Sequence, residues 1–114
     1  MNELKYKAAY AITKANLINE LAKCPLHKAF KIGKTTQELN DRFNEDYASD
    51  YECIAELYDA GIDGHLVDWL EEKMIEYCQN NYAELCDNKQ IGGGPPCTDN
   101  ANKSHTAKLY VVIR

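Results

Sequence analysis

Apolar residues with different spacings divide the first third of the chain into three predicted elements. Residues 5–13 are a short run of tyrosines and small apolar residues, which we interpret as a strand. Residues 16–23 space leucine and isoleucine as on one face of a short helix. Cys24-Pro25 is expected to end that helix, because proline cannot continue the helical hydrogen bonds. Residues 29–33 are predicted to form a second strand.

A second helix is predicted from residue 35 to about residue 48. It opens with Thr35-x-x-Glu38, a capping-box signature in which two side chains bond the free backbone amides of the first turn. Its predicted buried face consists of residues four apart: Leu39, Phe43 and Tyr47.

A third strand is predicted at residues 51–59, where alternation directs Cys53, Ala55 and Leu57 toward the core. A glycine turn follows, and the longest helical pattern then runs from about residue 65 to residue 81. The apolar residues Leu66, Val67, Leu70, Met74, Tyr77 and Cys78 share one face of that helix.

The last part of the chain predicts a loop and a terminal strand. Residues 90–106 contain three consecutive glycines and two prolines and are expected to be a long loop. Residues 107–113 end in a β-rich apolar run that we expect to close the sheet. The pattern as a whole predicts one α+β domain over residues 1–114, with a small, mostly antiparallel sheet flanked by helices.

Composition narrows the classes of function. A chain of 114 residues fits one domain, and no apolar run approaches the roughly 20 residues that a membrane span needs. The N-terminus lacks the apolar segment of a secretory signal. Five irregularly spaced cysteines favour a reducing cytoplasm over a disulfide framework. A net charge of −5 argues against a protein that coats nucleic acid without sequence specificity, because such a protein needs clustered Lys and Arg.

The segment Gly33-Lys34-Thr35 resembles the end of a nucleotide-binding loop. Such a loop needs a second glycine five residues before Gly33, and that position is Lys28. A nucleoside-triphosphate loop is therefore excluded.

The order of strand, strand, arginine-bearing helix and glutamate-bearing helix resembles the GIY-YIG nuclease superfamily, in particular its phage-type branch with a K-I-G second motif. Residues 8–12 stand at the first motif, with Tyr10 at its tyrosine. Residues 31–35, Lys-Ile-Gly-Lys-Thr, match the second motif, and Arg42 falls where the family's helix carries its arginine. The likeness covers about residues 6–80. The first motif lacks its glycine, and Lys31 replaces the second tyrosine.

This resemblance implies an endonuclease that hydrolyses DNA phosphodiester bonds with one Mg²⁺ or Mn²⁺. Tyr10 would act as general base, Arg42 would hold the phosphate and Glu71 would bind the metal. We expect Lys31 and Lys34 to shape the electrostatic field at the phosphate and Thr35 to lie beside it. A homodimer or a separate partner would provide specificity for DNA.

Helical geometry separates Glu71 from its neighbour Glu72. At about 100° per residue, Glu71 lies at the edge of the apolar face, and Glu72 points toward solvent. A carboxylate at the edge of a buried stripe is uncommon, and a bound metal would explain it. We therefore expect Glu71 to be the metal ligand.

Other interpretations stay open for the same residues. Tyr10 suits an ordinary core strand, and Arg42 suits an ion pair with Glu38 or Asp46 at helical spacing. The chain as a whole suits a catalytically inactive binding module of the same fold, for nucleic acid or a protein, or an unrelated α+β interaction protein. Structural zinc is a further alternative, with the ligand set Cys24, His27, Cys86, Cys97 and His105.

Overall fold

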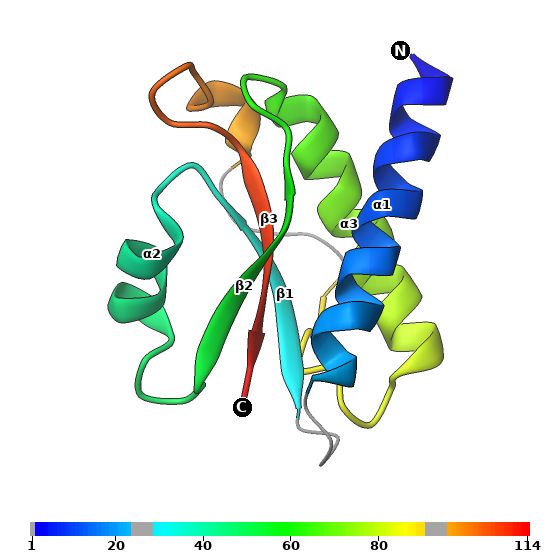
Figure 1. The fold of residues 1–114 in the computed structure, drawn as a ribbon, viewed down its shortest axis with the longest axis vertical. Coiled ribbons are helices and arrows are strands. Elements are labelled where there is room, and N and C mark those ends of the chain that lie inside the picture. Colours follow the sequence, from blue (N-terminus) through cyan, green and yellow to red (C-terminus); the bar gives the residue numbers. More distant parts are fainter. Residues whose placement is uncertain (1, 24–28, 91–95) are drawn as a thin grey trace.

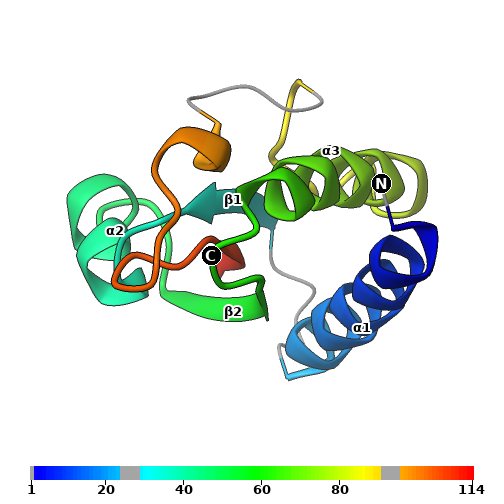
Figure 2. The ribbon, with the colours of Figure 1, turned by 90° about the horizontal axis from the view of Figure 1, so that it is seen from above.

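A three-stranded antiparallel sheet lies between one helix on one face and two helices on the other (Figures 1 and 2). The computed structural model describes residues 2–23, 29–90 and 96–114. Its elements are α1 (Glu3–Ala22), β1 (Phe30–Thr35), α2 (Leu39–Asp46), β2 (Cys53–Asp59), α3 (Gly64–Asn81), the short 3-10 helix η1 (Cys97–Asp99) and β3 (Lys108–Ile113). The predicted α+β class with a small antiparallel sheet is confirmed. No helix in the described ranges is both long and apolar enough to cross a membrane.

The last strand of the chain occupies the middle of the sheet. The strand order is β1-β3-β2, and β3 pairs antiparallel with both neighbours. All six residues of β3 are buried, because helices cover both of its faces (Figure 2). This double burial explains why the terminal segment is an uninterrupted apolar run rather than an alternating one.

Alternation along β3 divides the core into two parts. Leu109, Val111 and Ile113 pack with residues of α1 and α3 in the larger cluster. Tyr110 and Val112 point to the other face, where they form a smaller cluster with residues from α2 and its C-terminal end. Successive residues of a strand point to opposite faces, so β3 supplies both halves of the core.

The predicted strand at residues 5–13 is wrong, since those residues belong to α1. The side chain of Asn2 caps the helix by accepting a hydrogen bond from the backbone amide of Lys5 (3.0 Å). Alanine is the strongest helix former, and its frequency in this segment favours helix over strand. The residues packed inward recur at helical spacing: Tyr6, Ala9, Tyr10, Thr13 and Leu17. The short helix predicted at 16–23 is the C-terminal part of the same α1.

The predicted capping box of the second helix is also wrong. Thr35 is the last residue of β1, and its hydroxyl accepts a hydrogen bond from the amide of Gln37 (3.0 Å) in the turn that follows. The helix α2 begins only at Leu39, and its N-cap Glu38 makes no side-chain capping bond. The threonine therefore shapes the turn between β1 and α2.

The helix predicted at 65–81 is confirmed as α3, and the strand predicted at 51–59 is confirmed in its larger part as β2. The inward alternation of β2 is only partly right. Leu57 is buried, but Cys53 at the start of the strand is exposed. The register with β3 shifts between Glu56 and Tyr58, and this bulge lets both Leu57 and Tyr58 pack on the larger core.

Gly33 is required by the strand pairing. It lies opposite Tyr110 of β3, and the phenol ring of Tyr110 covers the position where any other residue would carry a Cβ. A Cβ at Gly33 would stand 2.3 Å from the Tyr110 hydroxyl and 2.4 Å from its ring carbon Cζ. Tyr110 is fully buried, and hydrogen bonds with Tyr47 and Arg42 hold its hydroxyl in place.

The Gly33→Ala variant is expected to lower the free energy of unfolding by about 1–3 kcal/mol, because it overpacks this contact. Urea unfolding should show that loss in the wild-type background and a much smaller loss when Tyr110 is replaced by Val, which removes the ring. Equal losses in the two backgrounds would show that the ring is not what excludes a side chain at residue 33.

Candidate functional site

A cleft of about 380 Å³ lies along the outer edge of β1, which is an edge strand of the sheet. Residues from β1, α2, α3 and β3 line it, together with the segment 87–90 that follows α3. Its charged and hydroxyl-bearing side chains are Lys31, Lys34, Arg42, Tyr47, Glu71, Asp87, Lys89 and Tyr110. Groups separated by as many as 79 positions, from Lys31 to Tyr110, thus share one concave surface.

The alternation of β1 distributes its lysines around the edge of the sheet. Phe30 and Ile32 point into the larger core, and Lys34, two residues further on, extends on that same face to α3. Gly33 is on the opposite face, beneath Tyr110. The cleft therefore receives a lysine from one side of the sheet and the tyrosine pair from the other.

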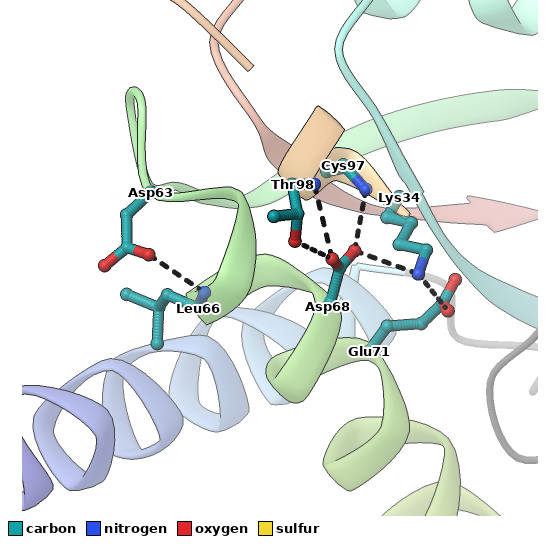
Figure 3. Close-up of polar contacts among 7 residues, drawn as sticks. All are labelled: Lys34, Asp63, Leu66, Asp68, Glu71, Cys97 and Thr98. Carbon is teal, nitrogen blue, oxygen red and sulfur yellow. Dashed lines mark hydrogen bonds and ion pairs between the residues drawn. The ribbon is translucent and has the colours of Figure 1, made fainter. Parts of the chain in front are cut away.

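The ammonium group of Lys34 lies between two carboxylates of α3 (Figure 3). Its Nζ is 3.0 Å from Asp68 Oδ1 and 3.4 Å from Glu71 Oε1. Only 10% of the Lys34 side chain is exposed. Burial lowers the pKa of Lys34, but the two carboxylates outweigh it and the net pKa is raised, so the ammonium stays charged.

Asp68 joins this cluster to the turn before β3. Its carboxylate accepts hydrogen bonds from the backbone amide of Cys97 (2.8 Å) and from the hydroxyl of Thr98 (2.6 Å) (Figure 3). η1 comes this close because Gly64 has no side chain, since a Cβ there would lie 2.6 Å from the Cys97 backbone. These bonds and Lys34 lower the pKa of Asp68 against the effect of burial. Asp68 is thus an ionised carboxylate that connects Lys34 to η1.

Glu71 is the less satisfied of the two carboxylates. Its side chain is 8% exposed, and within the described ranges its Oε1 accepts no hydrogen bond. Burial raises the pKa of Glu71, and the attraction of Lys34 only partly offsets this. The same oxygen pairs with the Lys34 ammonium at 3.4 Å, and this ion pair offsets only part of the cost of burying the carboxylate.

Two tyrosines and an arginine form the opposite wall of the cleft. The Tyr110 hydroxyl lies 2.7 Å from that of Tyr47 and accepts a hydrogen bond from Arg42 Nε at 3.3 Å. Arg42 also pairs with Asp46, one helical turn away. Burial and the bond to Tyr47 raise the pKa of Tyr110, whereas Arg42 lowers it. Tyr110 is therefore a neutral phenol, and Arg42 is a partly exposed cation beside it.

Asn88 closes one end of the open strand edge. Its side chain accepts a hydrogen bond from the amide of Ile32 (2.8 Å) and donates one to the carbonyl of the same residue (2.9 Å). The preceding segment forms a parallel bridge between Cys86 and Phe30. The backbone edge of β1 is thus covered as far as Ile32, and Asn88 itself lines the cleft.

The structure brings together most of the predicted site residues, but not Tyr10. Arg42, Glu71, Lys31 and Lys34 line the cleft. Thr35 lines a smaller adjoining hollow, which it shares with Lys34 and Arg42. Tyr10 lies on α1 and packs against Trp69, in a different cavity.

Sequence reasoning missed Tyr47, Tyr110 and Asn88 as members of one site. Tyr47 was expected only as a core residue, and Tyr110 was part of an apolar terminal strand. Their partnership depends on the pairing of β3 with β1, which no local pattern encodes. Asn88 carried no signal beyond a polar side chain near a loop.

Metal ligands are few in the described part of the chain. No three His, Cys, Asp or Glu side chains gather there closely enough to hold an ion. Of the alternative zinc set, Cys24 and His27 lie outside the described residues, and Cys86 and Cys97 are buried free thiols. Mg²⁺ needs fewer protein ligands, because it keeps several waters and often takes one or two carboxylates plus a substrate phosphate. The unsatisfied oxygen of Glu71 fits that requirement.

No family model, no curated protein and no solved structure matches this chain. The class of site is therefore defined by its geometry alone. Four cationic side chains line the cleft: Lys31, Lys34, Arg42 and Lys89. The lining also includes two carboxylates, the buried Glu71 and Asp87, which pairs with Arg114. Cations therefore outnumber carboxylates in the lining of this cleft.

Replacing Glu71 by Gln is expected to stabilise the fold at neutral pH. The raised pKa of Glu71 means that its proton is bound more tightly in the folded state. Its favourable contribution is present at low pH and is lost as the pH rises through the folded pKa. At pH 7.5, Glu71→Gln should raise the melting temperature by roughly 2–4 °C, and the gain should vanish near pH 4.

The matched control is Glu72→Gln, because Glu72 is the exposed neighbour on the same helix and should change the melting temperature little at either pH. A lower melting temperature of Glu71→Gln at pH 7.5 would mean that the ion pair with Lys34 outweighs the cost of burial.

Proposed function

We propose that this chain is a metal-dependent endonuclease that hydrolyses DNA phosphodiester bonds. The observation that carries the proposal is the convergence of Arg42, Lys34, Tyr110 and Glu71 on one cleft from four different elements. Hydrolysis of a phosphodiester needs an oriented water, positive charge at the phosphoryl oxygens and help for the leaving oxygen. The cleft contains groups suited to the first two of these tasks.

Arg42 and Lys34 are suited to bind the phosphate. A guanidinium group offers a planar set of donors that matches phosphoryl oxygens, and Arg42 is partly exposed with Nε anchored on Tyr110. Lys34 is close enough to supply a second charge, and Lys31 a third at the rim. These cations offset the overall acidity of the chain locally, where a DNA strand would lie.

The strand order supports a rearranged form of the GIY-YIG constellation. In the order expected from the sequence, the tyrosine strand precedes the K-I-G strand. In the structure, the strand paired with the K-I-G strand is the C-terminal β3, and it sets Tyr110 opposite Gly33. We assign the site tyrosine to Tyr110 in place of Tyr10. The chain would then be a circular permutation of the expected order, with the tyrosine strand moved to the end.

The proposed role of Tyr110 follows from its hydrogen bonds. A phenol with a raised pKa keeps its proton at neutral pH, so it is not a free phenolate base in this state. Its oxygen can accept a hydrogen bond from the attacking water and hold that water beside Arg42. Tyr47 fixes the hydroxyl from behind, so the orientation is built into the fold.

Glu71 would hold the divalent ion, Mg²⁺ or Mn²⁺. The ion would supply positive charge at the phosphate and lower the pKa of a bound water. Lys34 now neutralises Glu71 at 3.4 Å, and its other contact, Asp68, can retain it when Glu71 changes partner. A homodimer or a separate partner for DNA specificity, and a cytoplasmic location, remain predictions.

A second candidate function is a binding module of the same fold without catalysis. The observation in its favour is the ion pair between Lys34 and Glu71, because Lys34 already balances the negative charge of Glu71 without a metal. In that case the cleft would bind a nucleic-acid phosphate through Arg42 and the lysines, and Glu71 would only hold Lys34 in place.

The first test is nicking of supercoiled plasmid in the presence of Mg²⁺ or Mn²⁺. Wild-type protein should cleave, Glu71→Ala should lose at least about 100-fold in rate, and Glu72→Ala should stay within about twofold. Losses of that size are typical when a group that stabilises the transition state is removed. Chelation of the metal should abolish the remaining rate.

The same assay separates the two tyrosines. Tyr110→Phe should lower the rate about 10-fold or more, because it removes the hydroxyl that Arg42 contacts, whereas Tyr10→Phe should leave the rate unchanged. The opposite result would restore Tyr10 as the site tyrosine. Absence of cleavage by folded protein that still binds DNA would favour the binding module.

A further inference from the structure

A second cavity, of about 420 Å³, lies between α1 and α3. Its α3 residues include Trp69 and Lys73, whereas the cleft uses Glu71 and Ile75 of the same helix. At about 100° per residue these pairs face opposite sides of α3. The α1–α3 groove, as we call it, is therefore a separate site, and Tyr10 is one of its residues.

Aromatic rings form the walls of the α1–α3 groove. Trp69 contacts Tyr6 and Tyr10 of α1, with ring centres 5.1 and 6.3 Å apart. Tyr77 lines the groove about two helical turns after Trp69 on α3, and its ring contacts that of Tyr82. Trp69 and Tyr77 are only half buried. These contacts fix the rings while leaving part of each accessible.

Lysines surround the rings. The Nζ of Lys73 lies 6.0 Å from the centre of the Trp69 ring, and that of Lys14 lies 4.9 Å from the centre of the Tyr77 ring. Lys7 also lines the groove. Glu76 is the one carboxylate among the described residues of the lining. The groove thus has a local excess of positive charge in a chain whose net charge is −5.

We propose that the α1–α3 groove binds single-stranded nucleic acid by stacking its bases. Flat aromatic surfaces beside mobile cations are the combination that single-strand binding uses, with bases on the rings and phosphates on the lysines. Lys73 is exposed, so it can leave the ring for a phosphate when a base takes its place. The side chain of Asn80 at the rim can donate to and accept from base edges, whereas the amide of Asn81 donates to the carbonyl of Tyr77 (2.9 Å).

This binding does not rest on the proposed nuclease function, because it needs neither metal nor cleavage. Double-stranded DNA hides its bases inside the stack and would offer the groove only phosphates. An acidic peptide would meet the lysines but would leave the rings without stacking partners. The aromatic content of the groove therefore favours unpaired bases.

The test uses the fluorescence of Trp69, which is the single tryptophan of the chain. Titration with a ten-residue oligothymidylate in the presence of a chelator should quench this fluorescence in a saturable way. An abasic oligomer of the same length should bind at least about tenfold more weakly and quench little. Equal affinity for both oligomers, or no change in Trp69 fluorescence, would overturn the proposal.

Variants are compared by anisotropy of a labelled oligothymidylate. Lys73→Ala and Tyr77→Leu should each weaken binding several-fold, and Trp69→Phe, which keeps the packing with Tyr6, should weaken it about threefold. Lys103→Ala is the control for loss of an exposed lysine elsewhere. The anisotropy titrations contain a chelator and require no cleavage, so that failed cleavage and failed binding are distinguishable. Unchanged affinity in all three groove variants, confirmed as folded by circular dichroism, would contradict the assignment.

Discussion

The contact of Tyr110 with Gly33 is the constraint on which the sheet and the cleft both depend. The central position of β3 brings the tyrosine to the glycine of β1, and the absence of a side chain at Gly33 lets the ring lie flat over the strand. The hydroxyl then reaches Tyr47 and Arg42. One strand pairing thereby positions α2 against the sheet and sets the polar wall of the cleft.

The two carboxylates that contact Lys34 differ in how well their own hydrogen bonds are satisfied. Asp68 is satisfied by the turn at 97–99 and holds Lys34. Glu71 is buried with an oxygen that lacks a hydrogen bond. The fold therefore carries a carboxylate whose burial lowers stability, and the cation binding that we propose for Glu71 would account for that cost.

Local patterns were sufficient for α3, for β1 and for the placement of Glu71, because helical and strand periodicities directly report which side of an element is buried. They failed for residues 5–13, where the tyrosines indicated a strand, although the alanines favour a helix and Asn2 caps it. They also failed for Tyr110. Strand order is a long-range property, so no pattern within the terminal run identified its neighbour. Arg42 and Lys34 were found because the K-I-G segment and the helix after it are contiguous in sequence.

The central claim is that Glu71 is a metal ligand in the cleft, and paramagnetic NMR tests it most directly. Substoichiometric Mn²⁺ added to ¹⁵N-labelled protein should broaden backbone amides around Lys34 in β1 and around Glu71 in α3. The effect should disappear in Glu71→Gln and persist in Glu72→Gln. Broadening that is scattered over the acidic surface, or that survives Glu71→Gln, would contradict the account.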